Sequence, residues 1–426
     1  MPSPVPTSLS AKNEFPSFPV SLYLAPWIVP ISSSVIQDGA VAVSNGRILA
    51  VGSSSSIRAQ FAGARVESCP GVLLPGLVNA HIHLELSAYH HVPRPAPDET
   101  FCDWIRSLLQ LRQEGGIEPE DMARAARNML QRQHDAGVLL LLDIGNILPS
   151  SPATNPPAVH LSFLLELLGP TSKAEEQVLA RITSLPDSVA ATPHALYSTT
   201  PGIMTALKQR ADHLQHIFSL HVAESADEIE LLRSGQGCFR RFLEERGAWE
   251  NIFPCPGMDG RGAVEYLEHL GLLDPNLLCV HCVHVSEKEV QMLAAHGSKV
   301  CLCPGSNRFL GVGVAPLEMM LAHQLLPALG TDSIASNENL DLWREMQILR
   351  EDHPGVAPAA VMAMATQGGA KAMGCEEEFG TLAPGRKSNL LNVDSPALQG
   401  VDNGEQLLDT LTGGGRPDKI RWIVEA

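Results

Sequence analysis

The stretch Pro75-Gly76-Leu77-Val78-Asn79-Ala80-His81-Ile82-His83-Leu84-Glu85 decides how this sequence is interpreted. Residues i and i+2 of a strand point to the same face. His81 and His83 can therefore direct their imidazoles at one point, and neutral imidazole is a preferred ligand of zinc, iron and nickel. A single His-x-His pair is a weak signal, because the chain contains 16 histidines. Two polar loop histidines explain this stretch alone equally well.

Strand-like apolar runs alternate with amphipathic, helix-like segments from residue 72 onward. The runs cover residues 72–83, 138–143, 159–165, 189–194, 217–221, 277–281, 299–303 and 326–332. The helix-like segments cover residues 121–136, 174–184, 201–216, 227–246, 286–296 and 315–324. Fully apolar strands with helices between them indicate a parallel sheet buried on both faces. Eight such strands predict an α/β fold of the (β/α)8 TIM-barrel class, whose active site lies at the carboxyl ends of the strands.

Both ends of the chain are predicted to form short strands, at residues 22–24, 40–43, 47–51, 390–393 and 420–424. Asn45-Gly46 is a strong hairpin signal between two of them. We therefore expect a small β-sandwich domain built from residues 1–72 and 378–426, beside a catalytic barrel formed by residues 73–377. Residues 1 to about 18 are expected to be a loose arm.

Six polar residues lie at the ends of the predicted barrel strands: His81, His83, His194, His221, His281 and Asp332. One such residue is best explained as a hydrogen-bonded polar group, but six on five strands favour a common site. Three imidazoles and a carboxylate, from His81, His83, His221 and Asp332, would leave room for water on one divalent ion. A bound cation can lower the pKa of water from 15.7 to about 7. No lysine ends the fourth strand to bridge a second metal, so one ion is favoured.

Three residues are candidates for proton transfer around that water. Glu224 lies three residues after His221 and can reach the same cavity as a proton carrier. His281 is a candidate to hold or deprotonate the water, and Asp332 can pass a proton to the leaving group. Trp104, in the helix-like segment 101–105, is either a wall of the pocket or a core aromatic. The Pro/Gly-rich stretch 247–261 is either a lid or a surface loop.

Composition limits the possible partners. The chain carries 30 Lys+Arg against 47 Asp+Glu, a net charge of −17, which argues against nucleic acid and anionic membranes as partners. No apolar run approaches the roughly 20 residues that span a bilayer. Nine scattered cysteines indicate reduced thiols in a cytoplasmic protein. We expect a small-molecule substrate, and a homo-oligomer is compatible with the sequence.

The chain resembles the amidohydrolase superfamily, in its cytosine-deaminase-like and chlorohydrolase-like branch. The resemblance is carried by residues 75–85, 192–198, 221–225, 264–307, 330–345 and 380–394. It implies one zinc or iron ion, zinc being favoured, and hydrolysis at a ring carbon that bears an amine or a halide. By motif match, His81, His83, His221 and Asp332 would be ligands, and Glu224 and His281 catalytic. His194 matches a histidine that often contacts the substrate.

Two groups within that branch are similar to this chain. Residues 264–273 with Ser306-Asn307 look like methylthioadenosine/S-adenosylhomocysteine deaminases, whereas His83-Leu84-Glu85-Leu86-Ser87 and the stretch from Thr331 to Asn337 look closer to aminodeoxyfutalosine deaminases. The resemblance implies a metal-dependent hydrolytic deaminase of an aminated purine nucleoside that releases ammonia. The alternatives are a free-base deaminase, a halide-removing hydrolase, a cyclic amidase or a non-catalytic metal-binding relative. Ser333 is expected to contact substrate, and Glu85 either binds ribose or supports a ligand histidine.

Overall fold

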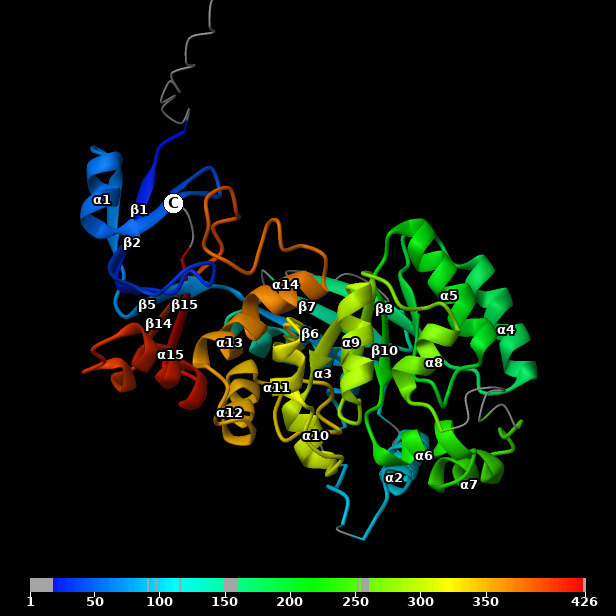
Figure 1. The fold of residues 1–426 in the computed structure, drawn as a ribbon. Helices are drawn as coiled ribbons and strands as arrows, with labels where there is room; N and C mark the ends of the chain where they lie inside the picture. Colours follow the sequence, from blue (N-terminus) through cyan, green and yellow to red (C-terminus); the bar gives the residue numbers. More distant parts are fainter. Residues whose placement is uncertain are drawn as a thin grey trace, which may run out of the picture.

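The computed structural model describes residues 18–89, 92–96, 98–114, 117–148, 159–250, 253 and 260–423. The predicted loose arm therefore lies outside the described residues, apart from Phe18. Figure 1 shows a β-rich part made from both chain ends, in blue and red, beside a larger part coloured from cyan to orange.

The larger part is an eight-stranded parallel barrel, as predicted. Its strands form two four-stranded sheets, in the orders β6-β7-β8-β9 and β10-β11-β12-β13. The strands are β6 (Leu77–Ile82), β7 (Val138–Gly145), β8 (His160–Leu167), β9 (Ala191–Pro193), β10 (Phe218–Val222), β11 (Leu277–His281), β12 (Lys299–Leu302) and β13 (Ala328–Leu329). Single parallel bridges, Ala195 to His221 and Ile82 to Asp332, join the two sheets at both seams. The barrel thus closes between its first and last strands.

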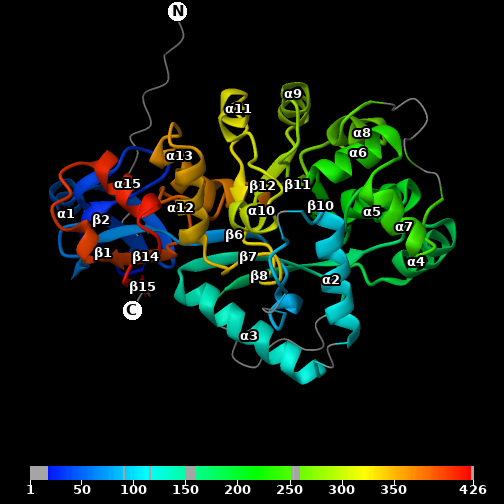
Figure 2. The same cartoon turned by 90° about the horizontal axis from the view of Figure 1, so that it is seen from below.

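Helices surround these strands, as the view from below in Figure 2 shows. Those that follow the strands are α2 (Phe101–Glu114), α3 (Pro119–Asp135), α4 (Ser172–Ser184), α5 (Pro201–Leu214), α6 (Ala226–Ser234), α7 (Cys238–Glu245), α8 (Ala263–His269), α9 (Glu287–His296), α10 (Pro304–Leu310) and α11 (Leu317–Ala322). The segment 227–246, predicted as one helix, is two, because Gly235 and Gly237 adopt positive φ angles of 65° and 96° that end α6 and begin α7.

Further helices follow the last barrel strand. They are α12 (Leu342–Asp352), α13 (Pro358–Ala363), the π-helical turn η2 (Met364–Gly368), α14 (Gly369–Ala372), the 3-10 turn η3 (Pro396–Leu398) and α15 (Gly404–Gly413). Within the described ranges, no helix is both long and apolar enough to cross a bilayer.

Strand β7 shows why the centre of the barrel is buried. All eight residues of β7, Val-Leu-Leu-Leu-Leu-Asp-Ile-Gly, are buried. A continuous apolar run of this kind fits a strand that is covered on both faces. The one carboxylate in it, Asp143, lies near the carboxyl end and accepts a hydrogen bond from the backbone N–H of Leu84 at 2.9 Å.

The smaller part is a seven-stranded sheet contributed by both chain ends. Its strands are β1 (Ser21–Ile28), β2 (Ile36–Ser44), β3 (Arg47–Ser53), β4 (Arg65–Ser68), β5 (Val72–Pro75), β14 (Leu390–Asp394) and β15 (Lys419–Ile423). Asn45 and Gly46, both with positive φ, form the predicted hairpin turn. The strands are hydrogen-bonded into one sheet. Side chains from both ends of it, such as Ile48 and Leu390, share one buried cluster, and helix α1 (Ser54–Gln60) packs on β2 and β3.

The run 72–83 was predicted as one strand and is two. Strand β5 pairs with β14 in the terminal sheet, whereas β6 pairs with β7 in the barrel. Gly76 separates them, and a Cβ there would lie 2.6 Å from the Cβ of Leu139. The chain therefore passes between the two parts at a position that only glycine fits. The domain boundaries themselves stay predictions.

Candidate metal site and cavity

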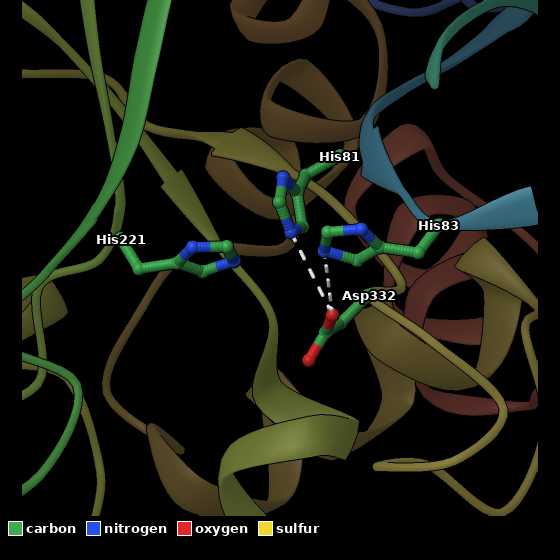
Figure 3. A group of neighbouring side chains, drawn as sticks. All are labelled: His81, His83, His221 and Asp332. Atoms are coloured by element: carbon green, nitrogen blue, oxygen red, sulfur yellow. Dashed lines mark ion pairs between the residues drawn. The ribbon is translucent and has the colours of Figure 1, made fainter. Parts of the chain in front are cut away.

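Four side chains from three barrel strands meet at the carboxyl end of the barrel. His81 lies in β6, His83 follows it directly, His221 lies in β10 and Asp332 follows β13. All four are buried, and one potential ligand atom of each lies within 4.8 Å of the others. Figure 3 shows the three imidazoles directed towards the carboxylate. We refer to these four residues as the His/Asp group.

The seam of the barrel brings the group together. The backbone N–H groups of Thr331 and Asp332 donate to the carbonyl of His81 at 2.9 and 3.1 Å. Asp332 adopts a left-handed φ of 58°, a conformation that costs a non-glycine residue free energy and that clusters at functional sites. The last strand thus places its carboxylate beside the two histidines of the first strand, with Oδ1 of Asp332 3.6 Å from Nε2 of His81 and 3.5 Å from Nε2 of His83.

Hydrogen bonds outside the group fix how its members point. Nδ1 of His83 lies 2.9 Å from the carbonyl oxygen of Ile144, and Nδ1 of His221 lies 2.9 Å from that of His194. Because a carbonyl only accepts, each Nδ1 carries the proton, and in the neutral ring Nε2 keeps its lone pair. The other carboxylate oxygen of Asp332 accepts hydrogen bonds from the hydroxyls of Ser306 and Ser336 at 2.6 and 2.7 Å. Such outer contacts are typical of metal ligands.

The surroundings of His81 indicate whether these four residues can bind a cation. It is fully buried, and neither of its ring nitrogens has a hydrogen-bond partner among the described residues. Burial lowers the pKa of His81 to about 3, so its ring is neutral and able to donate a lone pair. An unsatisfied buried nitrogen costs free energy, and a cation among the four side chains would satisfy it. The His/Asp group therefore fits a divalent metal ion.

A second pair of groups, Glu224 and His281, lies close to Asp332. Nε2 of His281, the last residue of β11, is 3.6 Å from Oε1 of Glu224. Nδ1 of His281 is 2.9 Å from Oδ1 of Asn307, which leaves Nε2 directed at the carboxyl group. Burial raises the pKa of Glu224 to about 8, and the Asp332 charge acts in the same direction. A carboxyl group with such a pKa can exchange protons near neutral pH.

Glu228 holds the turn that carries Glu224. Its buried carboxylate accepts hydrogen bonds from the backbone N–H groups of Ala223 and Glu224 at 3.1 and 2.9 Å. Ala223 has a positive φ of 53°, and His281 one of 72°. The backbone of both neighbouring strand ends is therefore held in a strained conformation, which fixes the position of the Glu224–His281 pair.

Glu224 and three members of the His/Asp group, His83, His221 and Asp332, line a cavity of about 320 Å³. Its floor consists of polar residues at the strand ends. Its wall consists of apolar side chains from α2 and α7, among them Phe101, Trp104 and Phe242. The rings of Phe101 and Trp104 are stacked with their centroids 5.8 Å apart. The cavity thus combines a polar, charged floor with an aromatic wall, as binding sites for small molecules do.

A disulfide bond joins the two helices of the wall. Cys102 of α2 and Cys238 of α7 are paired, with their Cα atoms 6.2 Å apart. The prediction that all cysteines are reduced is therefore wrong for this pair. The other cysteines in the described ranges are free thiols, and Cys279, Cys282, Cys301 and Cys303 are buried, as expected of small core residues.

The family is decided by comparison with known proteins. The sequence matches the amidohydrolase family over residues 72–419. This chain belongs to the amidohydrolase family. A second, short match, over residues 39–64, is to the imidazolonepropionase-like composite domain of bacteria.

Curated relatives within the family are similar to this chain over most of their own length. The methylthioadenosine/S-adenosylhomocysteine deaminase of Syntrophobacter fumaroxidans is 30% identical over 91% of this chain and 87% of its own. The enzyme of the same name from Moorella thermoacetica is 29% identical over 86% of this chain and 84% of its own.

Solved structures share the fold. Helicobacter pylori aminofutalosine deaminase, in complex with methylthio-coformycin, has a TM-score of 0.76 at 22% identity, covering 95% of this chain and all of that one (100%). An adenosine deaminase from Xanthomonas campestris with bound zinc has a TM-score of 0.71 at 23% identity. The match covers 94% of this chain and 90% of that one.

Among the predicted substrate contacts of this amidohydrolase, His194, Trp104 and Ser333 line the cavity. Glu85 does not. Its carboxylate accepts from the backbone N–H groups of Asn146 and Ile147 at 2.8 and 3.2 Å and lies 3.5 Å from Arg112. Of the two expectations for Glu85, contact with the substrate is corrected, because the chain leaves the strand at His83 and enters the 3-10 turn η1 (Leu84–Leu86), where side chains no longer alternate between two faces. Support of a ligand histidine by Glu85 stays a prediction.

Several lining residues escaped the sequence analysis, above all Glu166, at the carboxyl end of β8. The same rule that singled out the strand-end histidines would have found it, because it directly follows the apolar run 159–165. Tyr197 and Arg112 also line the cavity, without a comparable signal. Of the stretch 247–261, proposed as a lid or a surface loop, residues 251–252 and 254–259 lie outside the described part of the chain.

Proposed function

We propose that this protein is a metal-dependent hydrolytic deaminase that acts on the adenine ring of a nucleoside with a modified 5′ group and releases ammonia. One observation carries the proposal: Glu224, paired with the buried His281, lies beside the His/Asp group on the floor of a cavity with an aromatic wall. A pure metal-binding site would need neither Glu224 nor His281. The curated relatives named methylthioadenosine/S-adenosylhomocysteine deaminases support the choice of substrate class.

His81, His83, His221 and Asp332 would hold one divalent ion, for which zinc is the first candidate. When bound there, such an ion lowers the pKa of water to about 7 and so makes hydroxide accessible at neutral pH. The hydroxyls of Ser306 and Ser336 hold the Asp332 carboxylate in place while it serves this role.

Glu224 would carry the proton in this reaction. In the proposed mechanism its carboxylate takes a proton from the attacking water and delivers it to a nitrogen of the purine ring. The ring carbon beside that nitrogen becomes electrophilic as a result. His281 would orient the attacking water through Nε2, since its Nδ1 is tied to Asn307. Asp332 then helps to transfer a proton to the departing amine.

The cavity would hold the nucleoside between its wall and its floor. Trp104 and Phe101 present aromatic faces on which a purine or an apolar 5′ group can pack. His194, whose Nδ1 lies 2.8 Å from the hydroxyl of Ser198, keeps Nε2 available for the substrate. Ser333 completes the polar side of the cavity.

The test is a panel assay with zinc-loaded protein. Adenosine, methylthioadenosine, S-adenosylhomocysteine, aminodeoxyfutalosine and free adenine are compared by ultraviolet shift and ammonia release. We expect ammonia from the 5′-modified nucleosides, and less from adenine. Release of halide from a chlorinated triazine, or of a ring-opened product from a cyclic amide, without ammonia from any nucleoside would contradict the proposal.

A further inference from the structure

Glu166 is a buried carboxylate on the cavity floor that the proposed mechanism does not use. It is only 5% exposed and lines the cavity. Its Oε2 accepts a hydrogen bond from Nδ2 of Asn146 at 2.9 Å. Its Oε1 has no hydrogen-bond partner among the described residues. A buried carboxylate oxygen without a donor is costly, so this atom needs a partner that enters the cavity.

A second metal ion does not fit this position well. Glu166 lies close to His194 and His221, but Nδ1 of His221, 4.0 Å from Oε1 of Glu166, carries the proton that it donates to the carbonyl of His194. His221 would therefore offer its one lone pair, on Nε2, to the His/Asp group. Only Glu166 and His194 remain, which is fewer than the three protein ligands of a catalytic metal site. The expected partner of Oε1 is thus a hydrogen-bond donor of the substrate.

The position of Glu166 in the barrel identifies that donor. An adenine nucleoside offers two kinds, the 6-amino group and the sugar hydroxyls. The 6-amino group leaves from the carbon that faces Glu224 and Asp332, which follow β10 and β13. Glu166 ends β8, on the other side of β9 from β10, and its carboxylate groups with His194 and His221 rather than with Glu224 and His281. The sugar is therefore the part of the substrate that reaches it.

We propose that the Glu166 carboxylate accepts a hydrogen bond from a ribose hydroxyl, and that it makes the enzyme prefer ribonucleosides to deoxyribonucleosides. This inference rests on the proposed function and assigns to Glu166 the role that the sequence alone suggested for Glu85. Asn146 acts as a positioning residue, because its amide holds Oε2 and leaves Oε1 free for the sugar.

The experiment compares ribose preference in the wild type with that of Glu166→Ala and Glu166→Gln. Adenosine is assayed against its 2′-deoxy and 3′-deoxy analogues with zinc-loaded protein. Hydrogen bonds to a charged group correspond to roughly 10- to 100-fold in kcat/KM, so we expect the wild type to prefer adenosine over one analogue by that factor, mainly through KM. In Glu166→Ala the preference should fall below about threefold.

Two controls separate this role from a structural one. Metal content should be the same in the wild type and in both Glu166 variants, because Glu166 is not part of the His/Asp group. Glu230→Gln, at an exposed position on α6, should keep the full ribose preference. Should Glu166→Ala not fold, Glu166→Gln tests the same point, with a smaller loss of preference because its neutral amide accepts more weakly.

Two outcomes would overturn the assignment, and they are distinguishable. If the wild type deaminates nucleosides and the Glu166 variants keep its ribose preference, the role of Glu166 is wrong while the proposed function stands. If no nucleoside is deaminated by the wild type, the proposed function fails and the assignment of Glu166 fails with it.

Discussion

The floor and the wall of the cavity are built in different ways. The floor consists of residues at the ends of barrel strands, where the backbone is held by neighbouring strands and by left-handed turns at Ala223, His281 and Asp332. The wall consists of α2 and α7, which lie in the connections after β6 and β10 and are held to each other by a disulfide bond. The difference indicates that the floor determines the chemistry, while the wall determines which molecule is brought to it.

Replacing two members of the His/Asp group should have the largest effect on turnover. In His81→Ala/His83→Ala two of the four proposed ligands are missing, so we expect the bound metal and all measurable activity to be lost. Metal analysis of the purified protein checks this. The control is His213→Ala/His296→Ala, which removes two exposed histidines on α5 and α9 and should leave the metal content unchanged. Full metal content in the first variant would contradict the assignment of the site.

Removing the proton carrier should lower turnover without affecting the metal. Glu224→Gln is nearly isosteric but cannot shuttle a proton, so kcat should fall by roughly 10²- to 10⁴-fold with metal content and thermal stability unchanged. Steady-state kinetics and metal analysis measure the two effects. Glu230→Gln, an exposed position on α6, serves as the matched control. A wild-type rate in Glu224→Gln would remove this residue from the mechanism.

A change in the wall should alter substrate binding more than the chemical step. Trp104→Ala removes an aromatic surface from the cavity, and burying such a side chain contributes about 1.5–3 kcal/mol. We expect KM for the nucleoside to rise by roughly tenfold or more, with kcat changed much less. The control is Trp422→Ala in β15, outside the cavity lining, whose Nε1–H donates to the carbonyl of His134. A loss confined to kcat would mean that the wall takes part in the chemistry.

The disulfide bond should have the smallest effect on turnover. Cys102→Ala/Cys238→Ala removes a cross-link between residues 136 positions apart, which typically contributes about 2–4 kcal/mol to the free energy of unfolding. We expect urea denaturation to show that loss, with kcat/KM within about threefold of the wild type. Cys375→Ala, at a half-buried free thiol, is the control. Equal stability of the double variant and the wild type, both under oxidising conditions, would contradict the cross-link.

The sequence predicted the floor better than the wall for physical reasons. His81, His83, His221, His281 and Asp332 follow apolar runs, and the rule that parallel strands present their carboxyl ends at one face brings them together without further knowledge. The partners of α2 could not be found in this way, because an amphipathic helix shows which of its faces is buried but not what covers that face.

Two differences from the sequence-based expectations concern Glu85 and Glu166, which lie where strands end. Contact of Glu85 with the substrate would require the alternation of the strand to continue beyond His83, where the backbone turns instead. Glu166 was passed over although it directly follows an apolar run. The pairing of Cys102 with Cys238 depends on the approach of two distant helices, and nothing in nine scattered cysteines reveals it.

The closure of the barrel between β6 and β13 has a consequence for how the protein folds. The Ile82–Asp332 bridge joins the first barrel strand to the last, so it can form only when most of the chain has been made and packed. Pairing across so long a loop is slow because its closure entropy is lost before any contact compensates for it. A ribosome-bound chain that ends before Asp332 cannot assemble the four proposed ligands. Capture of a metal ion by the complete site would therefore report the closing step of folding, and metal uptake offers a direct kinetic signal for it.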